Sequence, residues 1–205
     1  MDWIIEMWKE NLSPFLTPLW ASLLFWRTLS LIFITLLVLS FIYRNRLKEF
    51  LFSTMTQEHD RKIFDMSSEI LRERRLIDFL DDLESDDSYW SNDFRCIQGF
   101  LEFFRESGNQ YKIKEINKKA KEFLIDLKQL ATFLGLQFFV HPAGQQPPNI
   151  RLCLHPEMNI DRAGYVSPEN RVKYGRLQDE LYKKCSKVRE KYQNYRESVK
   201  SKLSI

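Results

Sequence analysis

The uncharged stretch Thr28-Leu-Ser-Leu-Ile-Phe-Ile-Thr35-Leu-Leu-Val-Leu-Ser-Phe-Ile-Tyr43 decides the fold of this chain. The residues from Leu12 to Trp26 are also uncharged, so that Arg27 alone interrupts the run. An α-helix rises 1.5 Å per residue, and about 20 apolar residues cross the roughly 30 Å hydrocarbon core of a bilayer. The stretch therefore predicts a transmembrane helix over residues 21–43.

The sequence on each side of this segment predicts a retained anchor and its orientation. Asp2 and Glu6 stand where a signal peptide has basic residues, and the Arg44-Asn-Arg46-Leu-Lys48 run stands where a cleavage site has small ones. These cations outweigh Lys9 on the other flank, so the positive-inside rule places the N-terminus outside. We expect a single-pass protein of the inner (cytoplasmic) membrane with its C-terminal domain in the cytoplasm.

The flanks of the span are predicted to be interfacial. Residues 1–20 form an amphipathic N-terminus, bent at Pro14 and Pro18, and residues 44–55 form a basic juxtamembrane linker. An alternative is a short helical hairpin made of Leu12 to Trp26 and Thr28 to Tyr43.

Residues 56–205 are predicted to form one helical cytoplasmic domain. A first helix runs from about Thr56 to Leu83, and a second begins after the capping residues at Ser91. A third helix ends at Gly135. Its apolar residues are spaced alternately by three and four, as on one face of a helix. They are Ile113, Ile116, Ala120, Phe123, Leu127, Leu130 and Leu134.

A two-stranded β-hairpin over residues 136–154 follows, around a loop rich in Pro and Gly. We pair Val140 with Ile150, Phe138 with Leu152, and Leu136 with Leu154, which places these side chains on one face. Because two strands are weak alone, the hairpin must pack on the helices or extend the sheet of another subunit.

The C-terminal helix is predicted over residues 168–203, starting at Ser167-Pro168-Glu169. Its heptad-like apolar stripe packs either inside the domain or against a second copy. The fold class is mainly α: an N-terminal transmembrane helix, then a helical domain with the small hairpin and this long helix.

Charge is unevenly distributed, although the net charge of +3 does not itself indicate nucleic acid. Thr54 to Phe94 contains 5 Lys/Arg and 12 Asp/Glu, whereas Glu169 to Ile205 contains 11 and 5. We expect these regions to neutralise each other in part. The alternative is that the terminal helix binds an anionic nucleic acid or nucleotide, or a regulatory partner protein. The binding residues are then Lys183, Lys184, Lys187, Tyr192 and Tyr195.

The standard motifs of enzymes and metal sites are absent from the sequence. The best remaining group is His141, Cys153 and His155, whose residue types bind zinc. The predicted register separates the two histidines by about 20 Å, too far for one ion. We therefore expect no metal, no cofactor and no catalytic residues, with both histidines at strand ends.

Arg27 is the most suggestive single residue, because a cation beside an apolar span is costly unless it reaches an interface, a partner or water. Arg27 either snorkels to the outer interface or lines an oligomeric pore. Thr28 and Thr35 are seven residues apart and share a helix face, so they would line the same side of the pore. Otherwise their hydroxyls bond their own helix.

Three classes of function fit this layout. The favoured one is an oligomeric membrane effector whose cytoplasmic domain senses a signal and whose spans form a pore or disrupt the bilayer. The alternatives are a membrane-tethered adaptor that recruits partner proteins and a membrane-attached enzyme of unrecognised type. The effector is favoured because the amphipathic N-terminus, Arg27 and the long stripe all have a role in an oligomer.

The layout also carries a resemblance. A membrane segment between Leu12 and Lys48, followed by a small cytoplasmic domain, resembles the membrane-spanning effectors of bacterial anti-phage defence systems, including the Hailong type. The resemblance implies an effector that a ligand or partner holds inactive until infection, which would suit the basic terminal helix.

Overall fold

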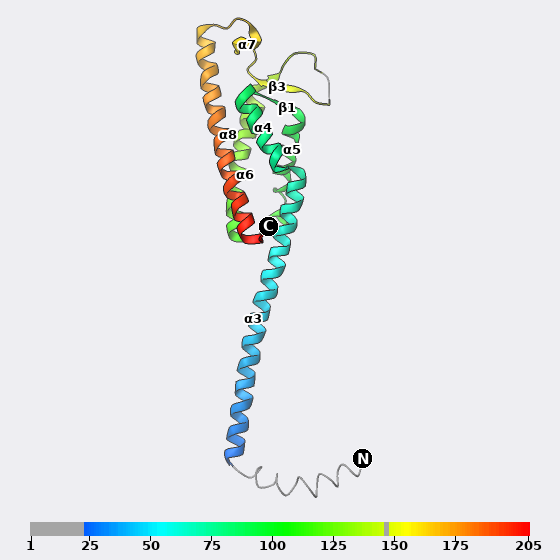
Figure 1. Ribbon diagram of the computed structural model, residues 1–205, viewed down its shortest axis with the longest axis vertical. Coiled ribbons are helices and arrows are strands. Elements are labelled where there is room, and N and C mark those ends of the chain that lie inside the picture. Colours follow the sequence, from blue (N-terminus) through cyan, green and yellow to red (C-terminus); the bar gives the residue numbers. More distant parts are fainter. Residues whose placement is uncertain (1–22, 146–147) are drawn as a thin grey trace. The chain divides into compact units, whose positions relative to one another are not determined.

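The computed structural model describes residues 23–145 and 148–205, and it is mainly helical with one small sheet (Figure 1). It divides into two compact units, Met1–Thr54 and Met55–Ile205. The predicted amphipathic segment 1–20 and the first residues of the predicted span lie outside the described residues.

The first unit is described through helix α3, which has the bounds Leu23–Ile70 and continues into the second unit. Every residue from Trp26 to Arg44 in this helix is exposed. The candidate span lies within the bounds of α3 and is helical, as the sequence predicts.

The second unit contains the end of α3 and all the remaining elements. Its helices are α4 (Glu73–Asp86), α5 (Ser91–Phe103), the 3₁₀ turn η2 (Ser107–Asn109), α6 (Lys114–Gln137), α7 (Ile160–Ala163) and α8 (Pro168–Leu203). Its strands are β1 (Ser88–Trp90), β2 (Phe138–Val140) and β3 (Arg151–Leu154). Helix α8 packs along α6, and α4 packs against α8 (Figure 1).

Helix α6 supplies the centre of the core. Of the stripe predicted for it, Ile116, Ala120, Phe123, Leu127, Leu130 and Leu134 are buried. The predicted end at Gly135 is wrong by two residues, since the helix continues to Gln137. Gly135 has a helical conformation here, and the chain leaves the helix only where Phe138 enters the sheet.

Helix α8 begins as predicted. The Ser167 hydroxyl accepts a hydrogen bond from the Asn170 backbone N–H at 3.3 Å, and Pro168 occupies the first turn. The stripe is buried within the same chain, so it forms the core face of the domain. Its buried apolar residues are Tyr174, Leu181, Cys185, Val188, Tyr192, Tyr195, Val199 and Leu203.

The predicted single helix from Thr56 to Leu83 is wrong, because the chain breaks between α3 and α4. Arg72 has an extended conformation, with φ −65° and ψ 142°. The break redirects α4 so that Leu76, Leu80 and Leu83 enter the core. No Gly or Pro marks this position, so tertiary packing overrides the local helix preference.

The predicted hairpin is part of a three-stranded antiparallel sheet with the order β1-β3-β2. The predicted register is wrong by two residues: Phe138 pairs with Leu154 and Val140 with Leu152, whereas Leu136 belongs to α6. A shift of two keeps each side chain on its face, so the pattern of alternation could not detect it. Strand β1 pairs with the other edge of β3, which gives the ribbon the third strand it needs.

Candidate functional site

The segment Trp26–Arg44 is the first candidate site. This segment, which we name the apolar window, is long and apolar enough to cross a membrane. Its mean hydropathy is 1.8, and none of it is buried. The side chains from Leu31 to Ile34 and from Leu36 to Leu39 are between 49% and 66% exposed. Successive residues of a helix are about 100° apart, so four in a row cover its whole circumference. A helix that is apolar on all sides suits an apolar surrounding.

Two polar residues of this segment, Thr35 and Arg27, differ in how their polar groups are accommodated. Thr35 donates its hydroxyl to the carbonyl oxygens of Leu31 and Ile32, at 2.5 and 3.0 Å. Thr28 is exposed, and Arg27 is exposed next to Trp26, where the apolar window begins. The hydroxyl of Thr35 is therefore satisfied inside its own helix, whereas Arg27 brings a charge to the end of the window.

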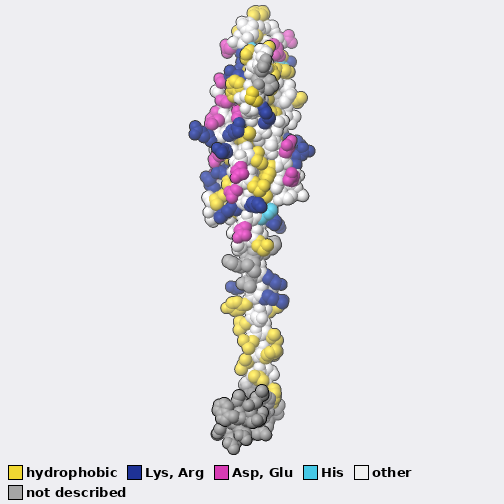
Figure 2. Space-filling view, turned by 90° about the vertical axis from the view of Figure 1, so that its right-hand side faces the viewer, with side chains coloured by type: hydrophobic (Ala, Val, Ile, Leu, Met, Phe, Trp, Pro, Cys, Tyr) yellow, Lys and Arg dark blue, Asp and Glu magenta, His cyan; other side chains and the backbone are white. Residues whose placement is uncertain are grey.

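The opposite end of the window is basic. The Arg44 guanidinium lies 5.5 Å from the centre of the Phe41 ring, and Arg46 and Lys48 are exposed. Figure 2 shows exposed hydrophobic side chains in this part of the chain, followed by Lys and Arg.

The second candidate site is the lysine group predicted on the terminal helix. Lys183, Lys184 and Lys187 line a hollow of about 200 Å³ between α6 and α8. Its other lining residues are Asp126, Gln129 and Glu180. The structure therefore brings the three lysines together, but on a surface that also contains carboxylates.

Lys184 is the most constrained of the three lysines. Its Nζ lies 3.3 Å from Glu180 Oε1 and 5.7 Å from the centre of the Phe133 ring. Lys183 and Lys187 form no ion pair in the described residues and are exposed. They are the cations available to an anion in this hollow.

Tyr192 and Tyr195 lie elsewhere. They are 6% and 2% exposed, and Tyr195 stacks on Phe123 with ring centres 5.9 Å apart. The hydroxyls of Tyr195 and Tyr111 are 2.5 Å apart. Burial raises the pKa of Tyr192 and that of Tyr195 well above the ordinary value. These two rings pack the core and are separate from the exposed lysine face.

The expected charge neutralisation occurs within the chain. Arg189 on α8 bonds Asp81 at 2.8 Å and Glu84 at 2.9 Å, both on α4. Arg196 bonds Glu73 at 2.8 Å. The acidic and basic regions are therefore neighbours, and part of the positive charge of α8 is already paired.

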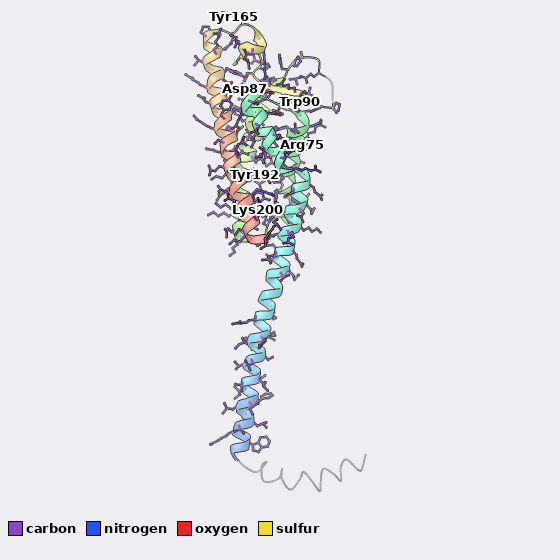
Figure 3. The ribbon with its side chains drawn as sticks, in the orientation of Figure 1. Arg75, Asp87, Trp90, Tyr165, Tyr192 and Lys200 are labelled. Atoms are coloured by element: carbon purple, nitrogen blue, oxygen red, sulfur yellow. The ribbon has the colours of Figure 1, made fainter. Side chains whose placement is uncertain are left out.

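A buried carboxylate that the sequence did not reveal is Asp87. It is 7% exposed, it has φ +48°, and it accepts hydrogen bonds from the Tyr174 hydroxyl at 2.8 Å and Gln178 Nε2 at 2.6 Å. Burial, then the bond to Asp87, raises the pKa of Tyr174 above its ordinary value. Figure 3 places Asp87 near one end of the second unit and Lys200 near the other. An Asp at a helix end is common, so no pattern of residues indicated this role.

His141, Cys153 and His155, whose residue types bind zinc, do not form a metal site in the structure. His155 bonds Glu157 Oε1 at 2.6 Å through Nδ1 and Gln137 Oε1 at 2.9 Å through Nε2. Cys153 is buried, which raises the pKa of its thiol, and its Sγ lies 4.0 Å from the His141 backbone oxygen. In the part of the chain that the structure describes, no three or more His, Cys, Asp or Glu residues group to hold a metal.

An apolar groove on the surface of α5 and α6 was not predicted. It encloses about 600 Å³, and its apolar lining includes Leu101, Leu124 and Ile125. The Ile125 side chain is 58% exposed. The groove is also lined by the charged residues Glu102, Arg105, Lys121 and Lys128. The groove would accept an apolar side-chain cluster with charges around it.

Comparison with known proteins gives no relative: no family model, no curated protein and no solved structure matches this chain.

Proposed function

We propose that this chain is an oligomeric membrane effector. Its Trp26–Arg44 helix spans the inner membrane, and its cytoplasmic unit controls how the spans of several copies pack, so that they open a pore or disrupt the bilayer. The observation that supports this most is the apolar circumference of the helix, because water would make contact with every side of it. Lipid removes that contact.

The orientation follows from charge. Arg44, Arg46 and Lys48 follow the window directly, and juxtamembrane cations favour the cytoplasmic side. The unit Met55–Ile205 follows these residues and is therefore cytoplasmic.

Arg27 supplies the polar element of the assembly. A charged side chain at the centre of a span costs about 2.5–3.5 kcal/mol, and less near an end, where it can snorkel. In an oligomer, Arg27 lies at the outer mouth of the pore, and Thr28 and Thr35 lie on one side of it. The Thr35 hydroxyl donates its hydrogen to carbonyl oxygens of its own helix. Its oxygen can therefore face the pore without a further hydrogen-bond acceptor for the hydroxyl.

The lysine hollow of α8 is the proposed control site. Lys183 and Lys187 are exposed and form no ion pair with any residue that the structure describes, and they suit the phosphates of a nucleotide or nucleic acid. The layout of a short span before a small cytoplasmic domain, similar to that of anti-phage membrane effectors, supports control by such a ligand or by a partner protein.

The groove on α5 and α6 favours a second candidate, a membrane-tethered adaptor. Its half-buried Leu101 and Leu124 and its exposed Ile125 could receive a partner, and an adaptor needs no change in the packing of the spans.

The experiment that separates the two functions is a membrane-potential measurement in cells that express the full chain, with and without candidate triggers. The effector depolarises the cells, and Arg27→Leu changes the extent. Arg74→Leu, which removes an exposed arginine from the cytoplasmic unit, behaves as wild type. A normal potential at equal amounts of membrane-inserted protein, under every condition, contradicts the effector and favours the adaptor.

The control site has its own test. Binding of ATP and of a mixed-sequence single-stranded oligonucleotide is measured against salt for wild type and for Lys183→Glu/Lys187→Glu. Each lost phosphate contact lowers the salt slope for single strands by about 0.7. Lys173→Glu/Arg176→Glu, exposed on the same helix, is the matched control. Equal binding by both double variants contradicts this site.

A further inference from the structure

Three segments of the second unit meet at one end of it, which we name the basal end. The Asp60 carboxylate in α3 accepts the backbone N–H of Lys112, just before α6, at 2.8 Å. Arg61 Nη2 donates to the carbonyl oxygen of Leu203, at the end of α8, at 2.8 Å. Figure 3 shows Lys200 in the same region of α8. The start of this unit, the start of α6 and the end of α8 therefore lie together.

Five exposed lysines lie just before or at the start of α6 and at the end of α8, and we name them the basal lysine group. They are Lys112, Lys114, Lys118, Lys200 and Lys202. Within residues 23–145 and 148–205, Lys202 alone of these five forms an ion pair, with Glu115 at 2.7 Å. Exposed carboxylates on the same segments include Glu106, Glu115 and Glu197. The other four lysines of the group form no ion pair within those described residues.

The chain itself brings this end toward the membrane. Met55 is the first residue of the second unit, and Arg44 is the last residue of the apolar window. Eleven residues of fully extended chain reach at most roughly 40 Å, whatever the orientation of the unit. Met55 is also 68% exposed, so the unit begins with an exposed apolar side chain. Of the surfaces of this unit, the basal end is the one closest along the chain to the apolar segment Trp26–Arg44.

We infer that the basal lysine group binds the anionic headgroups of the inner leaflet. This inference rests on the proposed function for the presence of the span in that membrane. Anionic lipids give the cytoplasmic surface a negative potential that attracts juxtamembrane Lys and Arg, and the attraction extends about one Debye length, roughly 8 Å in physiological salt. Arg44, Arg46 and Lys48 lie within the same field, so the span edge and the basal end form two successive basic contacts.

Docking on lipid has a mechanical consequence. A unit that is held at its basal end by headgroups has less freedom to rotate about its tether than a free one. Asp60 and Arg61 lie in the part of α3 that belongs to this unit. Asp60 forms hydrogen bonds to the segment just before α6, and Arg61 forms one to the end of α8, so the unit docks as one body. Lipid composition then affects how neighbouring copies pack.

The test uses the full chain in nanodiscs of phosphatidylcholine, alone or with about 30% phosphatidylserine. Lysine acetylation by a limiting reagent is followed by mass spectrometry. We expect Lys112, Lys114, Lys118 and Lys200 to react at least about threefold more slowly in the anionic discs. About 0.5 M NaCl, which shortens the Debye length to roughly 4 Å, abolishes the difference. Lys183 and Lys187, on the other candidate site, react equally in both discs.

A triple variant gives the matched comparison. Lys112→Glu/Lys114→Glu/Lys118→Glu removes the lipid dependence at Lys200, whereas Lys173→Glu/Arg176→Glu, at exposed positions of α8 outside both groups, keeps it. Protein that enters both kinds of disc but shows equal acetylation of the basal lysine group overturns this inference and leaves the proposed function standing. Failure to enter discs of either composition contradicts the span itself, and with it the proposed function.

Discussion

The buried carboxylate of Asp60 accepts the backbone N–H of Ile113 at 2.8 Å, across 53 residues of sequence. Its other oxygen accepts the N–H of Lys112 at 2.8 Å. Ile113, at the N-cap position of α6, has no side chain that can bond these groups. A residue of α3 thus takes over the capping of α6, and the charge of Asp60 faces the positive end of that helix dipole.

We expect Asp60→Ala to lower the free energy of unfolding by about 2–4 kcal/mol, because two N–H groups at the start of α6 lose their charged acceptor. Asp65→Ala, which removes an exposed acid from the same helix, changes it by at most about 0.5 kcal/mol. Urea unfolding of the full chain, followed by circular dichroism, measures both. Equal midpoints for the two variants would show that the cap contributes nothing.

The second prediction concerns alkaline pH. Burial raises the pKa of Tyr89 and that of Tyr111 to about 12, from the ordinary value near 10. The unfolded chain releases these protons first, so the stability that their protonation provides is complete below pH 10. It is lost as the pH rises toward 12, by up to about 1.4 kcal/mol per pH unit for each group.

Absorbance at the tyrosinate band, recorded together with circular dichroism, tests this. Tyr111→Phe removes one titrating group, so the fall in stability between pH 10 and 12 becomes shallower. Tyr165→Phe, at a position that is 80% exposed, leaves the slope as in wild type. If Tyr111→Phe has the wild-type slope, Tyr111 does not contribute to the pH dependence.

The third prediction concerns the cysteines. Cys153 and Cys185 are 1% and 0% exposed, and burial raises the pKa of both thiols, that of Cys185 to about 12. The thiolate is the reactive form, so a thiol reagent should modify both only on unfolding. Cys96, which is partly exposed, should react in the folded chain, and Cys96→Ser should abolish this fast reaction. Rapid modification of Cys153 in the folded protein would contradict the buried, structural role.

The sequence predicted those elements whose signals are local. The spacing from Ile116 to Leu134 indicates a buried stripe whatever the rest of the chain does, and Ser167-Pro168-Glu169 carries its own capping chemistry. The apolar run around Leu37 likewise needs no neighbour to be recognised. For these segments, the residue types and their spacing are sufficient.

The remaining features depend on distant contacts. The break at Arg72 has no Gly or Pro, and it places Leu76 and Leu80 against the core. Strand β1 is only three residues long and becomes recognisable only through its pairing with β3. Asp60 and Asp87 resemble surface acids in the sequence, and only the folded chain shows their donors. The heptad-like spacing places Tyr192 and Tyr195 on the stripe of α8, and only the folded chain shows that this stripe is buried inside the domain.

The central claim is that lipid surrounds the Trp26–Arg44 helix, and alkaline extraction of cell membranes followed by ultracentrifugation measures this most directly. We expect the full chain to remain in the membrane pellet. Ile34→Lys/Leu37→Lys should release it, since each lysine costs about 2.5–3.5 kcal/mol at the centre of a span. Thr132→Lys/Leu136→Lys, at exposed positions of α6, should stay in the pellet. Wild-type protein in the supernatant without detergent would contradict the account.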